Sequence, residues 1–161
     1  MASMSTLPAV SSELLVVPLA GIGDGALDEF AASLAREPRF FGRKSTPRPS
    51  VNWCSMLCHR SRRVGFAALV AGELVGVARL WPRTVDGLDM YVSVAAPWRQ
   101  MGIGARLVRE AFDLTAALGH TSVVAIAEHR KAPVQALARR FEMEPLRMIA
   151  GVTEFQATIA S

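Results

Sequence analysis

Six residues, Arg99-Gln100-Met101-Gly102-Ile103-Gly104, have the types and the spacing to bind a phosphate. Two glycines stand one residue apart at the start of a helical pattern, where backbone N–H groups have no intrahelical partner and the helix dipole is positive. Because glycine has no Cβ, an anion can approach these amides closely. The segment therefore predicts an anion site built from the main chain.

Two well-known phosphate loops do not fit this segment. A P-loop needs a Gly-Lys-Ser/Thr sequence four residues after its first glycine, and no such lysine is present. A Gly-x-Gly-x-x-Gly loop would need glycine at position 107, where the chain has leucine. Both alternatives are therefore rejected.

A second glycine pattern lies near the N-terminus, where residues 21–26 fit the Gly-x-Gly-x-x-Ala form of dinucleotide-binding folds. That fold needs a second strand ending in an acid about 20 residues further on. Residues 36–50 are instead rich in arginine and proline and have no strand pattern. We interpret the glycines as a turn and Asp24 as a helix N-cap.

A strand and a helix must position the segment at 99–104. The apolar run from Leu88 to Val94 predicts a strand that ends before Pro97. Apolar residues then recur every three or four positions and predict one buried helix face, with Gly119 as a left-handed C-terminal cap. The residues of that face are Ile103, Leu107, Ala111, Leu114 and Leu118.

The other patterns predict a mixed α/β chain. An antiparallel meander is expected because three apolar runs follow one another with short turns, the first at Gly72-Glu73. A helix separates the strand at 88–94 from the next apolar run, so these two strands should be parallel. The expected strands are 13–19, 64–71, 74–81, 88–94, 122–127 and two within 146–159; the expected helices are 24–34, 50–60, 103–118 and 133–141.

This element order, with the segment at 99–104, resembles the GCN5-related N-acetyltransferases (GNAT). In that family an Arg/Gln-x-x-Gly-x-Gly/Ala signature holds the pyrophosphate of acetyl-coenzyme A (acetyl-CoA). The likeness covers nearly the whole chain and implies a mixed sheet of about six to seven strands flanked by about four helices. It also implies acetyl-CoA as acetyl donor and no metal. The implied cofactor-binding residues are Val92, Val94, Arg99, Gln100, Met101, Gly102, Ile103, Gly104 and Ala105.

The family's reaction is direct attack of an amine on the thioester through a tetrahedral intermediate, so a base and an oxyanion donor are needed. The resemblance implies a backbone N–H near Val94 as the oxyanion donor and Asp89, at the start of the same strand, as a water-assisted base. Strand alternation should direct the Asp89 side chain away from Val92 and Val94. Glu128 and His129 are the second choice of base.

One family feature is missing. The last helix often carries an acid-catalytic tyrosine, and Ala138 stands at that position. The leaving thiolate should then be protonated by water or another group, or leave unassisted. The missing tyrosine favours a non-catalytic acyl-CoA-binding or regulatory module as the alternative, and Asp89 opposes it.

The acceptor is inferred from a looser likeness to bacterial protein-lysine acetyltransferase domains. An acid opens the strand before the signature, the tyrosine is missing, Phe40-Phe41-Gly42-Arg43 precedes the second helix, and Gly151-Val152-Thr153 opens the last strand. Protein lysine is therefore the first expected acceptor, and a small-molecule amine is the second. A homodimer is compatible with the sequence, which leaves the oligomeric state open.

Composition limits the remaining alternatives. With 161 residues, 51% of them hydrophobic, we expect one domain at 13–161 after a flexible leader at 1–12. No membrane-length apolar run or signal peptide is recognised, which predicts a cytoplasmic protein. Cys54 and Cys58 are expected to be reduced thiols, because a disulfide between neighbours on one helix face is disfavoured by geometry and a zinc site needs four ligands.

The segment from Arg36 to Arg63 has eight basic residues and one acid, Glu37. Such a cluster could contact an acidic protein, nucleic acid or cofactor phosphates. Nucleic acid is ranked last because few aromatic residues are interleaved with the basic ones.

Overall fold

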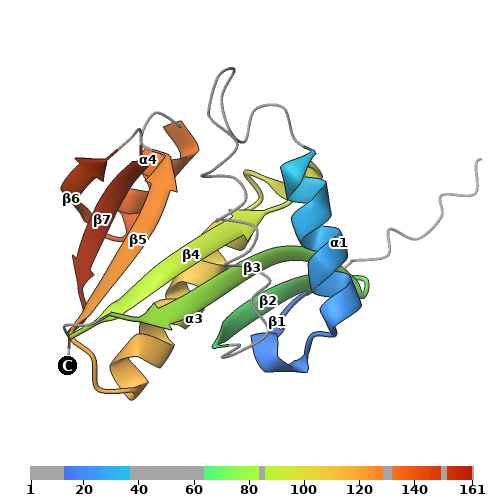
Figure 1. The fold of residues 1–161 in the computed structure, drawn as a ribbon, viewed down its shortest axis with the longest axis horizontal. Coiled ribbons are helices and arrows are strands. Elements are labelled where there is room, and N and C mark those ends of the chain that lie inside the picture. The colour runs from blue at the N-terminus through green and yellow to red at the C-terminus, as the bar shows by residue number, and fades with distance from the viewer. Residues whose placement is uncertain (1–12, 37–63, 84–85, 129–131, 150–151, 161) are drawn as a thin grey trace, which may run out of the picture.

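A computed structural model describes residues 13–36, 64–83, 86–128, 132–149 and 152–160. These residues form a seven-stranded sheet in the order β1-β2-β3-β4-β5-β7-β6 (Figure 1). The strands are β1 Leu14–Pro18, β2 Gly65–Val70, β3 Glu73–Pro82, β4 Leu88–Val94, β5 Ser122–Glu128, β6 Glu144–Ile149 and β7 Val152–Thr158. The helices are α1 Asp24–Ala35, α3 Ile103–Ala117 and α4 Ala132–Arg140, with 3-10 turns at Leu19–Gly21 and Ala96–Trp98.

The expected mixed α/β architecture is confirmed. β4 and β5 are parallel, and every other neighbouring pair in the sheet is antiparallel. Three α-helices lie in the described part of the chain, against about four expected. The helix expected at 50–60, the leader at 1–12, both cysteines and most of the basic segment at 36–63 lie outside the described residues.

Helices cover both faces of the sheet. α1 packs on one face, where Leu27, Phe30 and Leu34 form a buried cluster with Tyr91 of β4. α3 and α4 pack on the other face, where Val108 and Ala138 contact Met90 in a second cluster. Figure 1 shows α1 crossing in front of the sheet and α3 behind it. Alternate residues of β4 therefore lie under different helices.

Two sequence interpretations were wrong by one residue. The N-cap of α1 is Gly23, and Asp24 is the first helical residue, where its charge faces the positive end of the helix dipole. The turn between β2 and β3 is Ala71-Gly72, because Val70 pairs with Glu73 and both turn residues have positive φ. β1 and β2 are antiparallel, which excludes the parallel dinucleotide fold considered for residues 21–26.

The predicted face of α3 is largely confirmed. Ile103, Leu107 and Ala111 are buried, and Leu114 is partly buried. Leu118 is 53% exposed because the helix ends at Ala117. Gly119 follows with φ +81°, and its N–H donates to the carbonyl of Ala116, as expected for a left-handed cap.

Candidate functional site

The site begins where β4 and β5 separate. The two strands pair at only three positions, and the last pair joins Met90 to Ala125. β4 continues to Val94 and β5 to Glu128, so the strands part beyond that pair (Figure 1). In the described part of the chain, the edge of β4 that faces β5 has no strand partner from Tyr91 to Val94. We call this opening the gap.

The main chain of β4 turns its polar groups into the gap. Along an antiparallel strand, N–H and C=O groups point alternately toward and away from the partner strand. The Ala95 N–H donates to the carbonyl of Val75 on β3 (2.8 Å), so the polar groups of Val94, and by alternation of Val92, point away from β3. Arg99 Nε donates to the Val94 carbonyl (2.9 Å) and fixes the end of the strand.

The turn that follows β4 presents amides at the start of α3. Gln100 and Gly102 both have left-handed backbone conformations, with φ of 61° and 83°. The first intrahelical hydrogen bond runs from the Arg106 N–H to the Gly102 carbonyl (3.0 Å). The N–H groups of residues 103–105 precede that bond and have no partner within the helix. This arrangement suits an anion.

Gly104 leaves space at this turn that the fold does not need. A Cβ built there would meet only Leu137 and Val94, each at 3.9 Å, which is ordinary van der Waals contact. The missing side chain therefore relieves no clash within the protein. Its absence leaves the helix N-terminus open to an anion.

A cavity of about 470 Å³ joins the gap to the turn. Side chains of β4, β5, β7, α3 and α4 line it. Of the nine residues expected to bind the cofactor, seven line this cavity: Val92, Val94, Arg99, Gln100, Gly102, Gly104 and Ala105. The side chains of the other two do not line it, since Met101 is 65% exposed and Ile103 is buried in the core.

Asp89 lies on the opposite face of the sheet from this cavity, on the same face of β4 as Tyr91. Arg83 Nη1 donates to Asp89 Oδ1 (2.7 Å), and the two side chains are 25% and 22% exposed. Burial raises the pKa of Asp89, and the charge and hydrogen bond of Arg83 oppose that rise without cancelling it. A carboxylate with a raised pKa is a stronger base than an ordinary surface aspartate.

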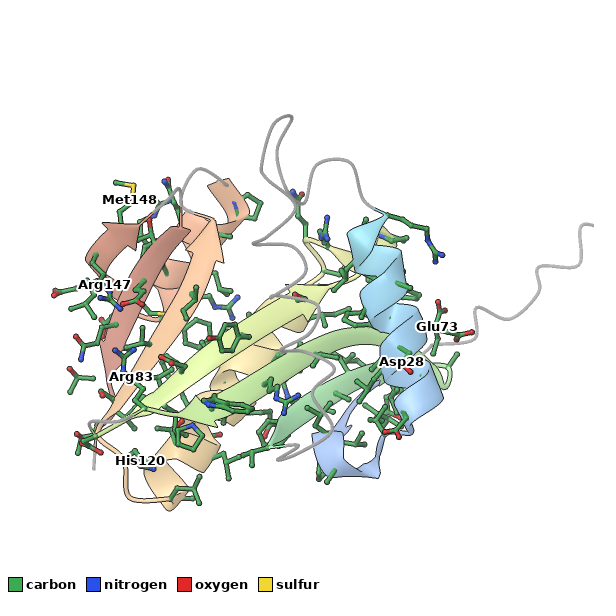
Figure 2. All side chains as sticks on the ribbon, in the orientation of Figure 1. Asp28, Glu73, Arg83, His120, Arg147 and Met148 are labelled. Carbon is green, nitrogen blue, oxygen red and sulfur yellow. The ribbon has the colours of Figure 1, made fainter. Side chains whose placement is uncertain are left out.

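Glu154 on β7 was not singled out in the sequence. Arg147 of β6 donates two hydrogen bonds to it, 2.6 Å and 3.0 Å long, and the hydrogen bonding lowers the pKa of Glu154. Figure 2 shows Arg83 beside the start of β4 and Arg147 on the C-terminal strands. The charge of Glu154 also raises the pKa of Asp89. In the sheet, Asp89 pairs with Val124 of β5 and Glu154 pairs with Ile126, two residues further along the same strand.

Tyr91, the only tyrosine in the chain, was also missed as a candidate. Its side chain is buried, and burial, followed by the charges of Asp89 and Glu154, raises its pKa to about 12. The phenol therefore stays protonated near neutral pH. A tyrosine two residues after the expected base, on the same strand face, is the signal that could have identified it.

Two further predictions concern the second choice of base and the tyrosine missing from the last helix. Glu128 ends β5, but its side chain, like the whole of His129, lies outside the described residues. α4 carries the buried Ala138 where the family often has tyrosine.

Within the described ranges, no group of three or more His, Cys, Asp or Glu residues could hold a metal ion, and no helix is long and apolar enough to cross a membrane.

Comparison with known proteins gives one family and many structures. The sequence matches the model of the Acetyltransferase (GNAT) family over residues 28–143. No curated protein matches the sequence.

Three solved structures illustrate the similarity of fold. PaiA N-acetyltransferase from Thermoplasma acidophilum, in complex with coenzyme A, has a TM-score of 0.71 at 7% identity, covering 91% of this chain and 99% of its own. The yncA structure from Salmonella typhimurium, with its cofactor acetyl-CoA, has a TM-score of 0.66 at 15% identity, covering 93% and 96%. The ribosomal-protein-S18-alanine N-acetyltransferase from Escherichia coli has a TM-score of 0.65 at 13% identity, covering 92% and 96%.

At these identities the structures establish the fold, and the family model, which spans most of the chain, establishes the family. The chain belongs to the GNAT acetyltransferase family, and it is an acyl-CoA-dependent N-acyltransferase.

Proposed function

We propose that this enzyme transfers the acetyl group of acetyl-CoA to a primary amine, with a protein lysine as the first candidate acceptor and Asp89 as general base. One observation carries the proposal: the gap opens on one sheet face to the glycine turn and its cavity, and Asp89 lies on the other face. Donor and acceptor can therefore approach the reacting carbon from opposite faces.

The donor side fits acetyl-CoA. The amides of residues 103–105 and the side chain of Arg99 would hold the pyrophosphate, and the polar groups of Val92 and Val94 would bind the pantetheine arm. Acetyl-CoA supplies an activated acyl carbon. The Val94 N–H, which points away from β3, would stabilise negative charge on the thioester oxygen.

The acceptor side must remove a proton from the amine. A lysine ammonium has a pKa near ~10, so it must be deprotonated before its nitrogen can attack. Asp89 precedes Val94 by five residues, roughly 17 Å along a strand, and a proton would therefore reach it through a chain of waters. Tyr91 lies between them on the face of Asp89 and offers a protonated hydroxyl to order that path.

The two carboxylates on this face, Asp89 and Glu154, are each paired with an arginine, so a cationic amine would meet a cluster without net charge. A protein acceptor has a parallel in the E. coli neighbour, which is named as an alanine N-acetyltransferase of a ribosomal protein. A small-molecule amine is the second candidate. A non-catalytic acyl-CoA-binding module is favoured only by Ala138, which stands where the family often has a catalytic tyrosine.

The Asp89→Asn variant tests the proposal. Asparagine has nearly the same shape but cannot accept the proton, so turnover with a lysine peptide should fall by about 10²-fold or more. The shift in melting temperature caused by CoA should be unchanged, because Asp89 does not line the cavity. Unchanged turnover would remove Asp89 from the role of base. Failure of wild-type protein to acetylate either peptides or small amines would favour the non-catalytic module.

A further inference from the structure

A group of hydrogen-bonded side chains joins the turn before β4 to the start of β5. The Thr121 hydroxyl donates to Asp86 Oδ2, and His120 Nδ1 lies 3.0 Å from Asp86 Oδ1. The Ser122 hydroxyl donates to the main-chain carbonyl of Asp86 (3.3 Å). The hydrogen bonds of Thr121 and His120 lower the pKa of Asp86, which is therefore a carboxylate at neutral pH. We call Asp86, His120 and Thr121 the latch.

His120 holds the turn before β4 whether or not its Nδ1 carries a proton. The same nitrogen lies 3.3 Å from the main-chain nitrogen of Gly87. With a proton on Nδ1 the ring donates to Asp86, and without one Nδ1 accepts from the Gly87 N–H. Both partners belong to the turn before β4, so His120 is tied to that turn in either state.

The main chains of this turn and of β5 come into close contact beside the latch. Gly87 has φ +115°, and a Cβ built there would lie 2.4 Å from Ser122 Oγ and 2.9 Å from the Ser122 carbonyl oxygen. Glycine permits both the backbone conformation and the approach. The latch therefore fastens two segments that are already packed backbone against backbone.

The latch lies at the junction between two halves of the sheet. Strands β1 to β4 form the first half, and β5, β7 and β6 form the second. Across the described residues, the main chains of the two halves pair at three positions, from Leu88 with Val123 to Met90 with Ala125. Figure 2 shows His120 and Arg83 at the end of the sheet where β4 and β5 begin. The latch thus closes the end of the β4/β5 pair that lies opposite the gap.

The groups that set the pKa of Asp89 are divided between the two halves. Asp89 lies on β4 and Arg83 follows β3, whereas Glu154 and Arg147 lie on β7 and β6. Asp89 also pairs with Val124 of β5, so the second half contributes to its surroundings. Burial is the largest influence that raises the pKa of Asp89, and Glu154 has a larger effect on it than Arg147. The distance between the halves should therefore affect the strength of this base.

We propose that the latch positions the base Asp89 by pinning the two halves of the sheet together at the closed end of the gap. Asp86 is the central positioning residue, because it contacts both His120 and Thr121. The inference rests on the proposed function, which assigns the role of base to Asp89. The latch itself touches neither substrate.

Loss of the latch should lower the pKa of Asp89. Without it, the three main-chain pairs and the core beneath them hold the halves together, and the starts of β4 and β5 can move apart. Asp89 then becomes less buried and lies farther from Glu154, and both changes favour its charged form. Arg83 and Tyr91 belong to the same hairpin as Asp89 and stay beside it.

Carbon-13 NMR titration of the carboxyl groups in the full chain measures the pKa of Asp89 without any acceptor. The pKa should be lower in Asp86→Ala than in the wild type. It should be unchanged in Asp113→Ala, the control, which removes an exposed aspartate of α3. An unmoved Asp89 pKa in Asp86→Ala would overturn the inference even if the free energy of unfolding falls, because a latch that only stabilised the fold would give that result.

His120 provides a second pair of variants. His120→Leu removes Nδ1 and should lower the pKa of Asp89 as Asp86→Ala does. His120→Asn keeps a short amide that can donate to Asp86 or accept from Gly87, so it should restore the wild-type value. If Asp86→Ala does not fold, this pair decides the matter. Equal Asp89 pKa values in His120→Leu and the wild type would count against the latch.

The pH–rate profile separates this inference from the proposed function. If Asp89 is the base, the pH below which kcat/KM with a lysine peptide falls should move down in Asp86→Ala, together with the pKa measured by NMR. A profile that stays in place while the measured pKa falls would keep the positioning of Asp89 by the latch and remove Asp89 from the role of base.

Discussion

At the scale of single residues, the environment of Asp89 combines opposing influences. Burial raises its pKa, the charge and hydrogen bond of Arg83 lower it, Glu154 raises it again, and Arg147 lowers it. The net effect is a pKa above that of an ordinary aspartate. Because a base must be deprotonated to act, the rate should fall as the pH drops through this pKa, and the neighbouring charges should set where that fall occurs.

Two substitutions should move this acidic limb of the pH–rate profile in opposite directions. Arg83→Gln removes the charge that holds the proton off Asp89, so the limb should move to higher pH. Glu154→Gln removes a negative charge that favours the protonated form, so the limb should move to lower pH. The measurement is kcat/KM against pH with a lysine peptide.

A matched control for this pair is Arg109→Gln, which removes an exposed arginine from α3 and should leave the limb in place. Shifts of the same sign in Arg83→Gln and Glu154→Gln, or no shift in either, would show that the acidic limb does not report the ionisation of Asp89.

Gly104 gives a second residue-scale prediction. A Cβ there touches the protein only at ordinary distances, so Gly104→Ala should fold normally and gain up to about 1 kcal/mol of helix stability. The signature accepts alanine at this position, so a larger side chain is needed to block the anion site: in Gly104→Val the affinity for CoA should fall by about tenfold or more, equal to about 1.4 kcal/mol. Melting temperatures with and without CoA separate the two effects.

Gly25→Val is the matched control, because Gly25 is also the second residue of its helix and also has space around it. Its CoA response should equal that of the wild type. Equal CoA affinity in Gly104→Val and Gly25→Val would contradict an anion site at the start of α3.

At the scale of elements, the signature helix is the part that the sequence predicted best. Its apolar spacing identified Ile103, Leu107 and Ala111 as buried, because a helix of this length repeats one face several times. The helix termini were less predictable. Asp24 is a common N-cap residue type, yet Gly23 is the cap of α1, since either residue satisfies the local preference and tertiary contacts decide between them.

Packing of α3 on the sheet can be tested with two leucines of that region. Leu107 is fully buried against β3, and Leu107→Ala should lower the free energy of unfolding by about 2–5 kcal/mol through lost burial and a residual cavity. Leu118 is 53% exposed, and Leu118→Ala should change the free energy of unfolding by no more than about 0.5 kcal/mol. Equilibrium unfolding in urea measures both, and equal losses would contradict the observed placement of α3.

At the scale of the whole molecule, the sheet separates the donor face from the acceptor face. The parallel β4/β5 pair was predictable because a helix connects the two strands. The gap and the cofactor-binding residues were expected only from the family resemblance, and seven of the nine line the cavity. Glu154 was not predictable in the same way. It reaches the neighbourhood of Asp89 only because β7 pairs with β5 across the sheet, and no local pattern encodes that long-range pairing.

The central claim is that acetyl-CoA lies in the gap between β4 and β5, and amide NMR of the full chain tests it most directly. Titration with acetyl-CoA should shift the amide signals of Val92, Val94 and residues 103–105 more than any others. Those signals report the groups that point into the gap and the unpaired amides of the α3 N-terminus. If they stay unmoved while the signals of the glycine turn at 21–25 shift, the ligand binds elsewhere and the account is wrong.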